Sequence, residues 1–331
     1  MCRFVWIHHI GSYVMKLLLM EYFNNVTYLF LEGHVELEKY RYLYFAVTLT
    51  AYLLIICCNS VVIFVIYSSK QLHEPMYIFI AALLFNSLIG TAALYPKLLV
   101  DFLSEIQVTS LSACLFQAYL IYSYAAAEFT LLSAMAYDRY VSICKPLQYA
   151  SLIKMSTVRK ILFCCWFVSF SGNGVGTVLT YQLQLCKQRM NRIYCNNYSI
   201  VKLSCGNVFV NNIYGLFVLF AMVFPSLIFI SFSYFRILAV CLRNSTIIRR
   251  KAFQTCFPHL IIFIIFTVTM CFEIIGSRFE ANLPQLFAMI MSVEFVVIPP
   301  LVNPIMYGLK LQEILNSIKR IICKKRTHIS F

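Results

Sequence analysis

Seven long apolar stretches divide this chain, and no other feature of the sequence limits its fold as strongly. A helix that crosses the apolar core of a bilayer needs about 20 mostly apolar residues. Only 12% of the 331 residues are charged and 61% are hydrophobic, more apolar surface than a soluble fold covers. We therefore predict an all-α membrane protein, a seven-transmembrane helix bundle. The expected spans are Leu43–Tyr67, Met76–Leu98, Leu111–Tyr137, Lys160–Tyr181, Val210–Leu242, His259–Gly276 and Leu286–Leu309.

The basic residues orient these spans. Lys and Arg collect on the cytoplasmic side of membrane helices, which explains the net charge of +14 before any nucleic-acid partner is needed. With the N-terminus outside, every inner connection is basic, and the acids on that side are Glu74, Asp138 and Glu313. We expect one domain, with an extracellular segment over 1–42, the bundle over 43–309 and a cytoplasmic tail over 310–331.

The N-terminal segment carries two expectations. Residues 1–19 lack the sustained apolar core of a signal peptide and read as an over-extended start, so translation from Met1, Met15 or Met20 stays open. The sequon Asn25-Val26-Thr27 lies on the outer side, which predicts glycosylation of Asn25.

The tail is predicted to lie on the inner leaflet. A short amphipathic helix over Leu311–Ile322 presents basic residues to anionic lipid headgroups. Cys323 follows it, either palmitoylated or as a free thiol. On the outer side, four cysteines at or between the ends of the apolar stretches allow three disulfide pairings, between which the sequence alone does not choose. They are Cys114, Cys186, Cys195 and Cys205.

Two ionisable sites interrupt the third stretch. Asp138 and Arg139 end it, and an Arg at a membrane edge costs little when it is paired. The pair is either a static interfacial ion pair or part of a switch. Glu128 lies deeper, where an ionisable residue is a functional hypothesis by default.

Five motifs occur at the ends of the expected spans. They resemble, in order, those of vertebrate odorant receptors, a family of rhodopsin-like (class A) G-protein-coupled receptors, and the resemblance extends from about Tyr42 to Lys310. The motifs are LHEPMYIF at 72–79, MAYDRYVSICKPLQY at 135–149, SYFRI at 233–237, KAFQTCFPHL at 251–260 and PLVNPIMYGLK at 300–310.

The resemblance implies an odorant receptor of the plasma membrane of olfactory sensory neurons. It would bind a small odorant inside the bundle and activate a heterotrimeric, stimulatory G protein, with no enzyme activity and no cofactor. The alternative is a non-olfactory receptor of the same fold for a small ligand or peptide. A small-molecule transporter fits less well, because the chain shows no internal repeat.

The resemblance also assigns roles to residues. It pairs Cys114 with Cys195 and Cys186 with Cys205, and it implies that span six swings outward on activation, so that Arg139 leaves Asp138. The residues of the coupling switch are Asp138, Arg139, Tyr140, Tyr234, His259, Asn303, Pro304 and Tyr307.

The ligand pocket is expected in the outer half of the bundle, between spans three, five, six and seven. Its walls are predicted to be apolar except for the Tyr122 hydroxyl. Because Ile121 stands where amine-binding receptors usually hold a carboxylate, a monoamine ligand is not expected. The pocket residues are Ile121, Tyr122, Ala125, Ala126, Val218, Met222, Met270, Ile274 and Val293.

Three polar residues are expected within the membrane, namely Asn59, Ser87 and Glu128. Asn59 and Asn303 are expected to bond to water or to each other. Ser87 stands where the family often has Asp, which makes a cation site at Glu128 doubtful. The alternative is a protonated Glu128 bonded to Ser133, Ser87 or water.

Overall fold

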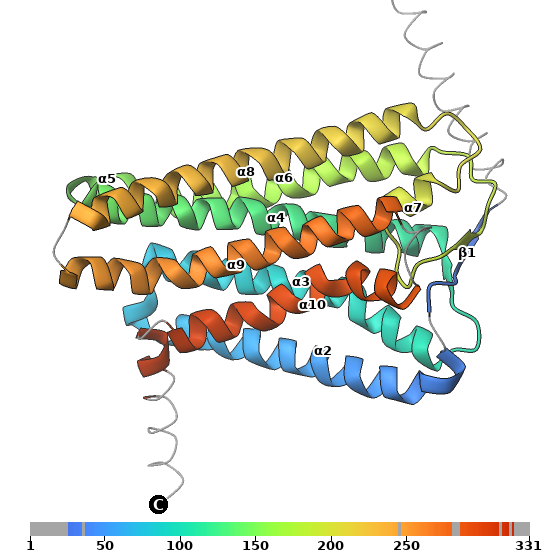
Figure 1. Cartoon of the computed structure of the whole chain (residues 1–331), viewed down its shortest axis with the longest axis horizontal. Coiled ribbons are helices and arrows are strands. Elements are labelled where there is room, and N and C mark those ends of the chain that lie inside the picture. The colour runs from blue at the N-terminus through green and yellow to red at the C-terminus, as the bar shows by residue number, and fades with distance from the viewer. Residues whose placement is uncertain are drawn as a thin grey trace, which may run out of the picture.

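Seven long helices run side by side through the molecule (Figure 1). The computed structural model describes residues 26–34, 37–243, 246–279, 285–310, 313–317 and 320. Each long helix contains one predicted apolar stretch and continues past it, so the predicted fold class is confirmed. The helices are α2 (Leu37–Ser68), α3 (Pro75–Leu103), α4 (Leu111–Cys144), α6 (Met155–Tyr181), α8 (Phe209–Arg243), α9 (Thr246–Phe279) and α10 (Gln285–Lys310).

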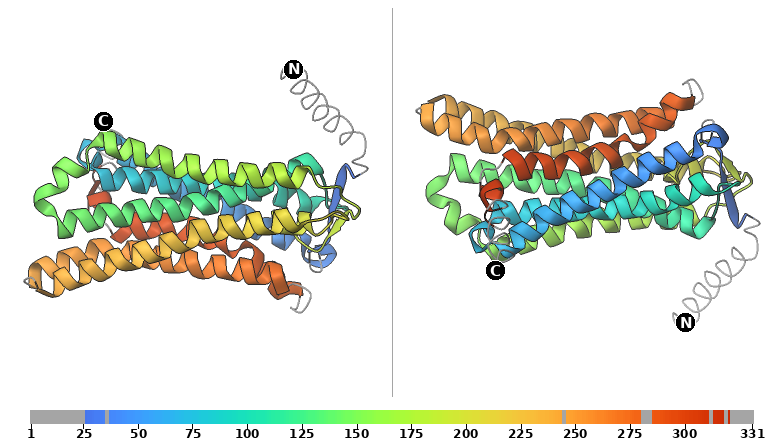
Figure 2. Two further views of the ribbon diagram at one scale, coloured as in Figure 1. Left: turned by 90° about the horizontal axis from the view of Figure 1, so that it is seen from above. Right: turned by 90° about the horizontal axis from the view of Figure 1, so that it is seen from below.

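Helix α4 is the central helix of the bundle, and Figure 2 shows the others packed around it. Six of the described long helices are apolar enough over a sufficient length to cross a membrane, and α4 is the exception. It contacts α3, α6, α8 and α9, and it buries Gln117, Glu128 and Asp138. A helix enclosed by others needs little apolar surface toward lipid, which explains its lower hydropathy.

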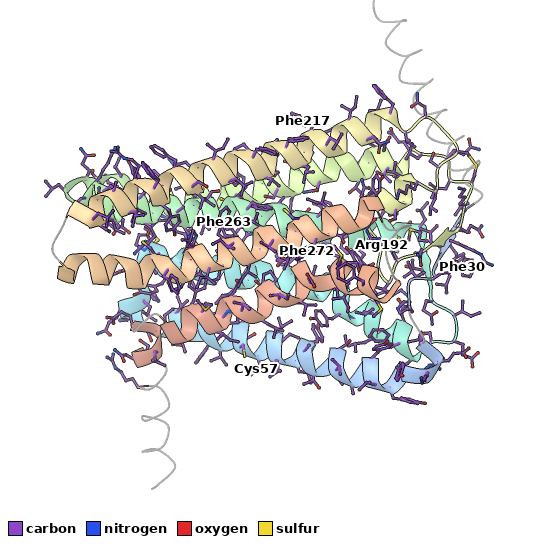
Figure 3. All side chains as sticks on the ribbon, in the orientation of Figure 1. Phe30, Cys57, Arg192, Phe217, Phe263 and Phe272 are labelled. Carbon is purple, nitrogen blue, oxygen red and sulfur yellow. A yellow bond between two sulfur atoms is a disulfide. The ribbon has the colours of Figure 1, made fainter. Side chains whose placement is uncertain are left out.

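The outer faces of the surrounding helices are apolar, as a lipid-facing surface requires. Phe217 on α8 and Phe272 on α9 are exposed, whereas Phe263, also on α9, is buried (Figure 3). The largest core cluster of buried side chains lies along α3 and α4 and extends to α2, α9 and α10. Lipid and core therefore see opposite faces of the same helices.

Helix α10 contains Pro299, Pro300 and Pro304 without ending. Because Pro304 has no backbone N–H, the carbonyl of Pro300 four residues earlier loses its helical partner. The buried side chain of Asn59 on α2 donates to that carbonyl at 2.9 Å. The Asn59 amide thus bonds to the carbonyl that the proline leaves unpaired and not to Asn303, while the expected bonds to water stay a prediction.

A small sheet caps the outer end of the bundle, and the purely helical prediction did not include it. Its central strand β1 (Tyr28–Leu31) comes from the N-terminal segment. It pairs antiparallel with β2 (Val108–Ser110) and parallel with β3 (Arg189–Met190). The Glu32 amide extends this pairing by donating to the Met190 carbonyl at 2.7 Å. The N-terminal segment is therefore part of the fold.

Two disulfides order the loop after α6, one tying it to α4 and the other closing the loop on itself. They join Cys114 to Cys195 and Cys186 to Cys205, the pairs implied by the resemblance. The Cys195 amide also donates to the Gln117 side-chain carbonyl of α4 at 2.9 Å. The same loop forms the short helix α7 (Asn197–Val201). The loop is thereby fixed over the outer ends of α4 and α6.

Short helices form the inner connections. They are η1 (Lys70–Leu72), η2 (Pro146–Gln148) and α5 (Tyr149–Leu152). In the tail, residues 313–317 are helical with Ile314 buried, and Arg320 donates to the side-chain carbonyl of Gln71 at 3.0 Å. Asn25, the alternative start sites and Cys323 lie outside the described residues.

The disulfide pairing predicts a definite peptide map. Digestion of the protein without reduction should yield one peptide pair that joins Cys114 to Cys195 and another that joins Cys186 to Cys205. Mass spectrometry before and after reduction identifies them. A peptide that joins Cys114 to Cys186 would contradict the assignment.

Gly33 predicts how tightly the cap is packed. A Cβ atom at this position would lie 2.5 Å from the Arg192 carbonyl carbon, which is backbone and cannot rotate away. Gly33→Ala should therefore cost about 1–3 kcal/mol, as overpacking usually does, and lower the melting temperature of the purified protein. Gly206→Ala is the matched control, because its added methyl group meets only the Ser204 hydroxyl at 3.6 Å. Equal melting temperatures for the two variants would refute the close contact.

Candidate functional site

A cavity of about 170 Å³ lies between α4, α6, α8 and α9, under the loop that carries α7. Small residues on facing helices leave this space, among them Ala118 and Ala125 on α4 and Gly172 and Gly176 on α6. Ligand sites between bundled helices are concave and mostly apolar in this way. Seven of the predicted pocket residues line the cavity, namely Tyr122, Ala125, Ala126, Val218, Met222, Met270 and Ile274.

The position of the cavity differs from the prediction in one respect. Span four, which is α6, contributes to the wall, and no described residue of span seven does. Helix α10 packs against α2, α3 and α9, on the other side of α4. Ile121 is therefore fully buried in the main core, and Val293 packs against that core instead of lining the cavity. These two predicted pocket residues therefore do not line this cavity.

The outer part of the cavity wall is polar, contrary to the expectation of an apolar pocket with one hydroxyl. Asn173 and Thr177 reach it from α6, Asn197 from α7, and Asn211 and Asn212 from α8. One of these side chains also links α7 to α6. The Thr180 hydroxyl of α6 donates a hydrogen bond to the Asn197 side-chain carbonyl at 2.8 Å. The helix termini and the capping loop supply this polar set.

Glu273 of α9 is the acidic residue in the described wall, and its side chain is almost completely buried. Its Oε1 accepts a hydrogen bond from the Tyr194 hydroxyl at 2.9 Å and from the Asn196 amide at 3.3 Å. Its Oε2 lies 3.4 Å from Nη1 of Arg192, which is 4% exposed. Figure 3 places Arg192 at the outer end of the bundle, near α9. Three residues of the capping loop thus converge on one carboxylate of α9.

Glu273 was not among the predicted site residues, although its place in the sequence pointed to it. An ionisable residue inside a predicted span is a functional hypothesis by default, and Glu273 lies within the expected span His259–Gly276. Its partner Arg192 could not have been inferred, because it is remote in the sequence and its position depends on the folded loop. Burial and the neighbouring carboxylate raise the pKa of the Tyr194 phenol, so it remains a hydrogen-bond donor.

A second buried acid, Glu128, joins three helices in the middle of the bundle. Its two oxygens accept from Asn86 of α3 and from Asn303 of α10, each at 2.9 Å. The Asn303 amide also lies 3.3 Å from the Ser87 hydroxyl. Ser133, an expected partner, instead donates to the Phe129 carbonyl of its own helix at 2.9 Å. The amides of two asparagines therefore occupy the carboxyl oxygens.

At the inner end, Asp138 and Arg139 form a buried ion pair. Arg139 Nε lies 3.0 Å from Asp138 Oδ2, and Nη2 donates to the same oxygen. Oδ1 accepts from the hydroxyl of Tyr149, on α5, at 2.8 Å. Burial, then the Asp138 carboxylate, raises the pKa of the Tyr149 phenol, so it remains a donor. Tyr149 is the last residue of the motif at 135–149, but its hydrogen bond to Asp138 was not predicted.

The remaining predicted switch residues come from four helices. The hydroxyl of Tyr234 on α8 contacts Nδ1 of His259 on α9, and Nε2 of that histidine lies 3.0 Å from the Leu132 carbonyl of α4. One imidazole thus links three helices. The Tyr307 hydroxyl is buried, 4.0 Å from the Met135 sulfur, and Tyr140 packs against the small inner core cluster. The structure therefore places the predicted set on α4, α8, α9 and α10.

Comparison with known proteins agrees with these observations. The family model for olfactory receptors matches residues 48–325. Human olfactory receptor 11A1 is 33% identical over 92% of this chain and 96% of its own length. Human olfactory receptor 51E1 is 31% identical over 90% and 94%, and human olfactory receptor 52A5 is 34% identical over 83% and 88%. The chain therefore belongs to the olfactory receptor family of odorant-sensing, multi-pass membrane receptors that act through G proteins and are not enzymes.

Proposed function

We propose that the cavity between α4, α6, α8 and α9 is the odorant site. The observation that carries this proposal is a cavity whose inner part is lined by Ala125, Phe129, Val218, Met222 and Met270, all apolar. Burial of apolar area contributes roughly 25 cal/mol per Å². A small odorant has little area to bury, so its affinity should be on the order of micromolar to millimolar.

Asp138 and Arg139 are the proposed residues through which the odorant-bound receptor activates a stimulatory G protein. Arg139 has its carboxylate partner on the same helix. When the inner helix ends separate, the Arg139 side chain can therefore turn away from Asp138 without any unfolding of α4. Tyr234, bonded to His259 in this state, is the proposed restraint for Arg139 in the active state. Pro304 gives α10 a bend point near this region.

The proposed location is the plasma membrane of olfactory sensory neurons, with glycosylation at Asn25 outside and contact between the basic tail and inner-leaflet lipid. The basic inner connections and the small sheet at the opposite end support an orientation with the N-terminus outside the cell. The direct test is an odorant panel with a cAMP readout in cells that express the receptor together with an olfactory-type stimulatory G protein. No response to any odorant, from a receptor shown to be at the surface, would refute the proposed function.

Arg139→Ala tests the coupling role. The variant should lose odorant-evoked cAMP almost completely, because the G protein loses a charged contact, while surface labelling remains largely intact. Arg159→Ala is the matched control, since it removes the same charge from the exposed inner surface near the start of α6. Undiminished cAMP from Arg139→Ala at equal surface expression would refute the switch.

Ala125→Phe tests the cavity. A phenyl ring at Ala125 fills space that the odorant would need, so the variant should lose or change its odorant responses while still reaching the membrane. Ala221→Phe, an exposed position on α8 outside the described cavity lining, is the control for a ring added to the bundle. If Ala125→Phe responds like the parent receptor to a cognate odorant, the odorant binds elsewhere.

A further inference from the structure

The cavity is polar at one end and apolar at the other. On α8 the lining changes from Asn211 and Asn212 near the outer end to Val218 and Met222 deeper in the bundle. On α9 the deeper residue is Met270 and the outer one is Glu273. A bound molecule that matches this pattern has a polar head beneath the capping loop and a hydrocarbon part toward Phe129 of α4.

Among the described residues that line the cavity, Glu273 is the charged one, and its partner Arg192 lies outside this lining. Glu273 lines the cavity, whereas its partners Arg192, Tyr194 and Asn196 are absent from the described lining. The polar side chains around it are amides and hydroxyls, which are neutral. The described wall therefore presents one acid and no Lys or Arg to a ligand.

Glu273 has acceptor capacity left for a ligand. An ionised carboxylate offers about four lone-pair sites. Two short-range donors, Tyr194 and Asn196, use Oε1. Oε2 lies 3.4 Å from Nη1 of Arg192, longer than the usual 2.7–2.9 Å of a charge-assisted hydrogen bond. A donor that enters from the cavity can make a shorter bond to Oε2.

We propose that this receptor recognises small aliphatic molecules whose polar end donates hydrogen bonds, and that a primary amine binds best and a carboxylic acid poorly. The inference rests on the proposed odorant site and names the ligand class for it. An ammonium group pairs with Glu273 in a water-poor site, whereas a carboxylate is repelled there. The sequence did not predict a monoamine ligand, because the α4 position where amine-binding receptors usually hold a carboxylate is Ile121. The structure supplies the acid from α9.

Contacts of the capping loop explain how Arg192, and with it Glu273, is held in place at the outer end of the cavity. The Gly33 amide donates to the Arg192 carbonyl at 3.3 Å, and Arg189, three residues earlier, forms an ion pair with Glu32 at 2.7 Å. The arginine backbone is thus fixed to the N-terminal strand. Its guanidinium comes from the capping loop to Glu273, and Glu273 also lines the cavity.

The test uses ligands that share one straight carbon chain and differ only at the polar end. Hexylamine, hexanol, methyl pentyl ether and hexanoic acid, and the octyl equivalents, are applied to receptor-expressing cells with a cAMP readout. The same compounds are tested for thermal stabilisation of the purified receptor. The amine should act at the lowest concentration, then the alcohol. The ether and the acid should be at least about tenfold weaker, the least that one charge-assisted hydrogen bond contributes.

Glu273→Gln assigns the preference to one side chain. The substitution keeps the shape and removes the charge, so the amine should lose its advantage over the alcohol. Met222→Leu at the apolar end is the matched control, and it should shift amine and alcohol alike. Wild-type ranking decides the case even if Glu273→Gln does not reach the surface.

Two results would overturn the ligand class. One is an acid or ether at least as potent as the amine on the wild-type receptor, and the other is an unchanged amine preference in surface-expressed Glu273→Gln. If such a non-donor ligand is active and Ala125→Phe abolishes its effect, the odorant site stands and only the ligand class is wrong. If no compound in a broad odorant panel activates or stabilises the receptor, the proposed function itself fails.

Discussion

The arrangement of the bundle depends on the buried carboxyl group of Glu128. It accepts from Asn86 and from Asn303, each at 2.9 Å, so one side chain of α4 is tied to α3 and to α10. Hydrocarbon offers no water to replace a lost partner, and an unpaired polar group there costs several kcal/mol. These bonds fix how α4 is rotated between its neighbours. The small residues Ala118, Ala125 and Ala126 then face α6 and α8, and that rotation creates the cavity.

The cap and the bundle are joined by a second buried acid. Glu273 connects α9 to three residues of one loop, and the Cys114–Cys195 disulfide connects the same loop to α4. Removal of one partner from a buried ion pair usually costs about 3–5 kcal/mol, because the other charge stays buried and uncompensated. The cap is therefore an energetic part of the receptor, and the N-terminal segment that holds Arg192 supports the proposed ligand site although it is remote in the sequence.

The sequence predicted well whatever depends on local pattern or on motif. Apolar length placed every span, since each observed helix contains its predicted stretch, and the motifs located Asp138, His259 and Asn303. Contacts between remote segments were harder. The strand Tyr28–Leu31 is too short to show a pattern of its own and forms only because two loops supply its neighbours. The exclusion of Ile121 and Val293 from the cavity likewise depends on which helix packs against which, and apolar periodicity does not encode that.

Helix α9 connects the proposed ligand site with the proposed switch. Glu273 and His259 lie about four turns apart on it. The outer residue is tied to the cap, and the inner one is tied to the Leu132 carbonyl at 3.0 Å and to the Tyr234 hydroxyl. In the proposed mechanism, a donor ligand draws Glu273 toward the cavity and so changes the outer tie. Because both residues lie on one continuous helix, this mechanism carries the displacement to His259, whose two bonds break as the inner end moves outward. In the same mechanism the Tyr234 hydroxyl is then freed, so the proposal links a change at one buried acid to the opposite end of the receptor.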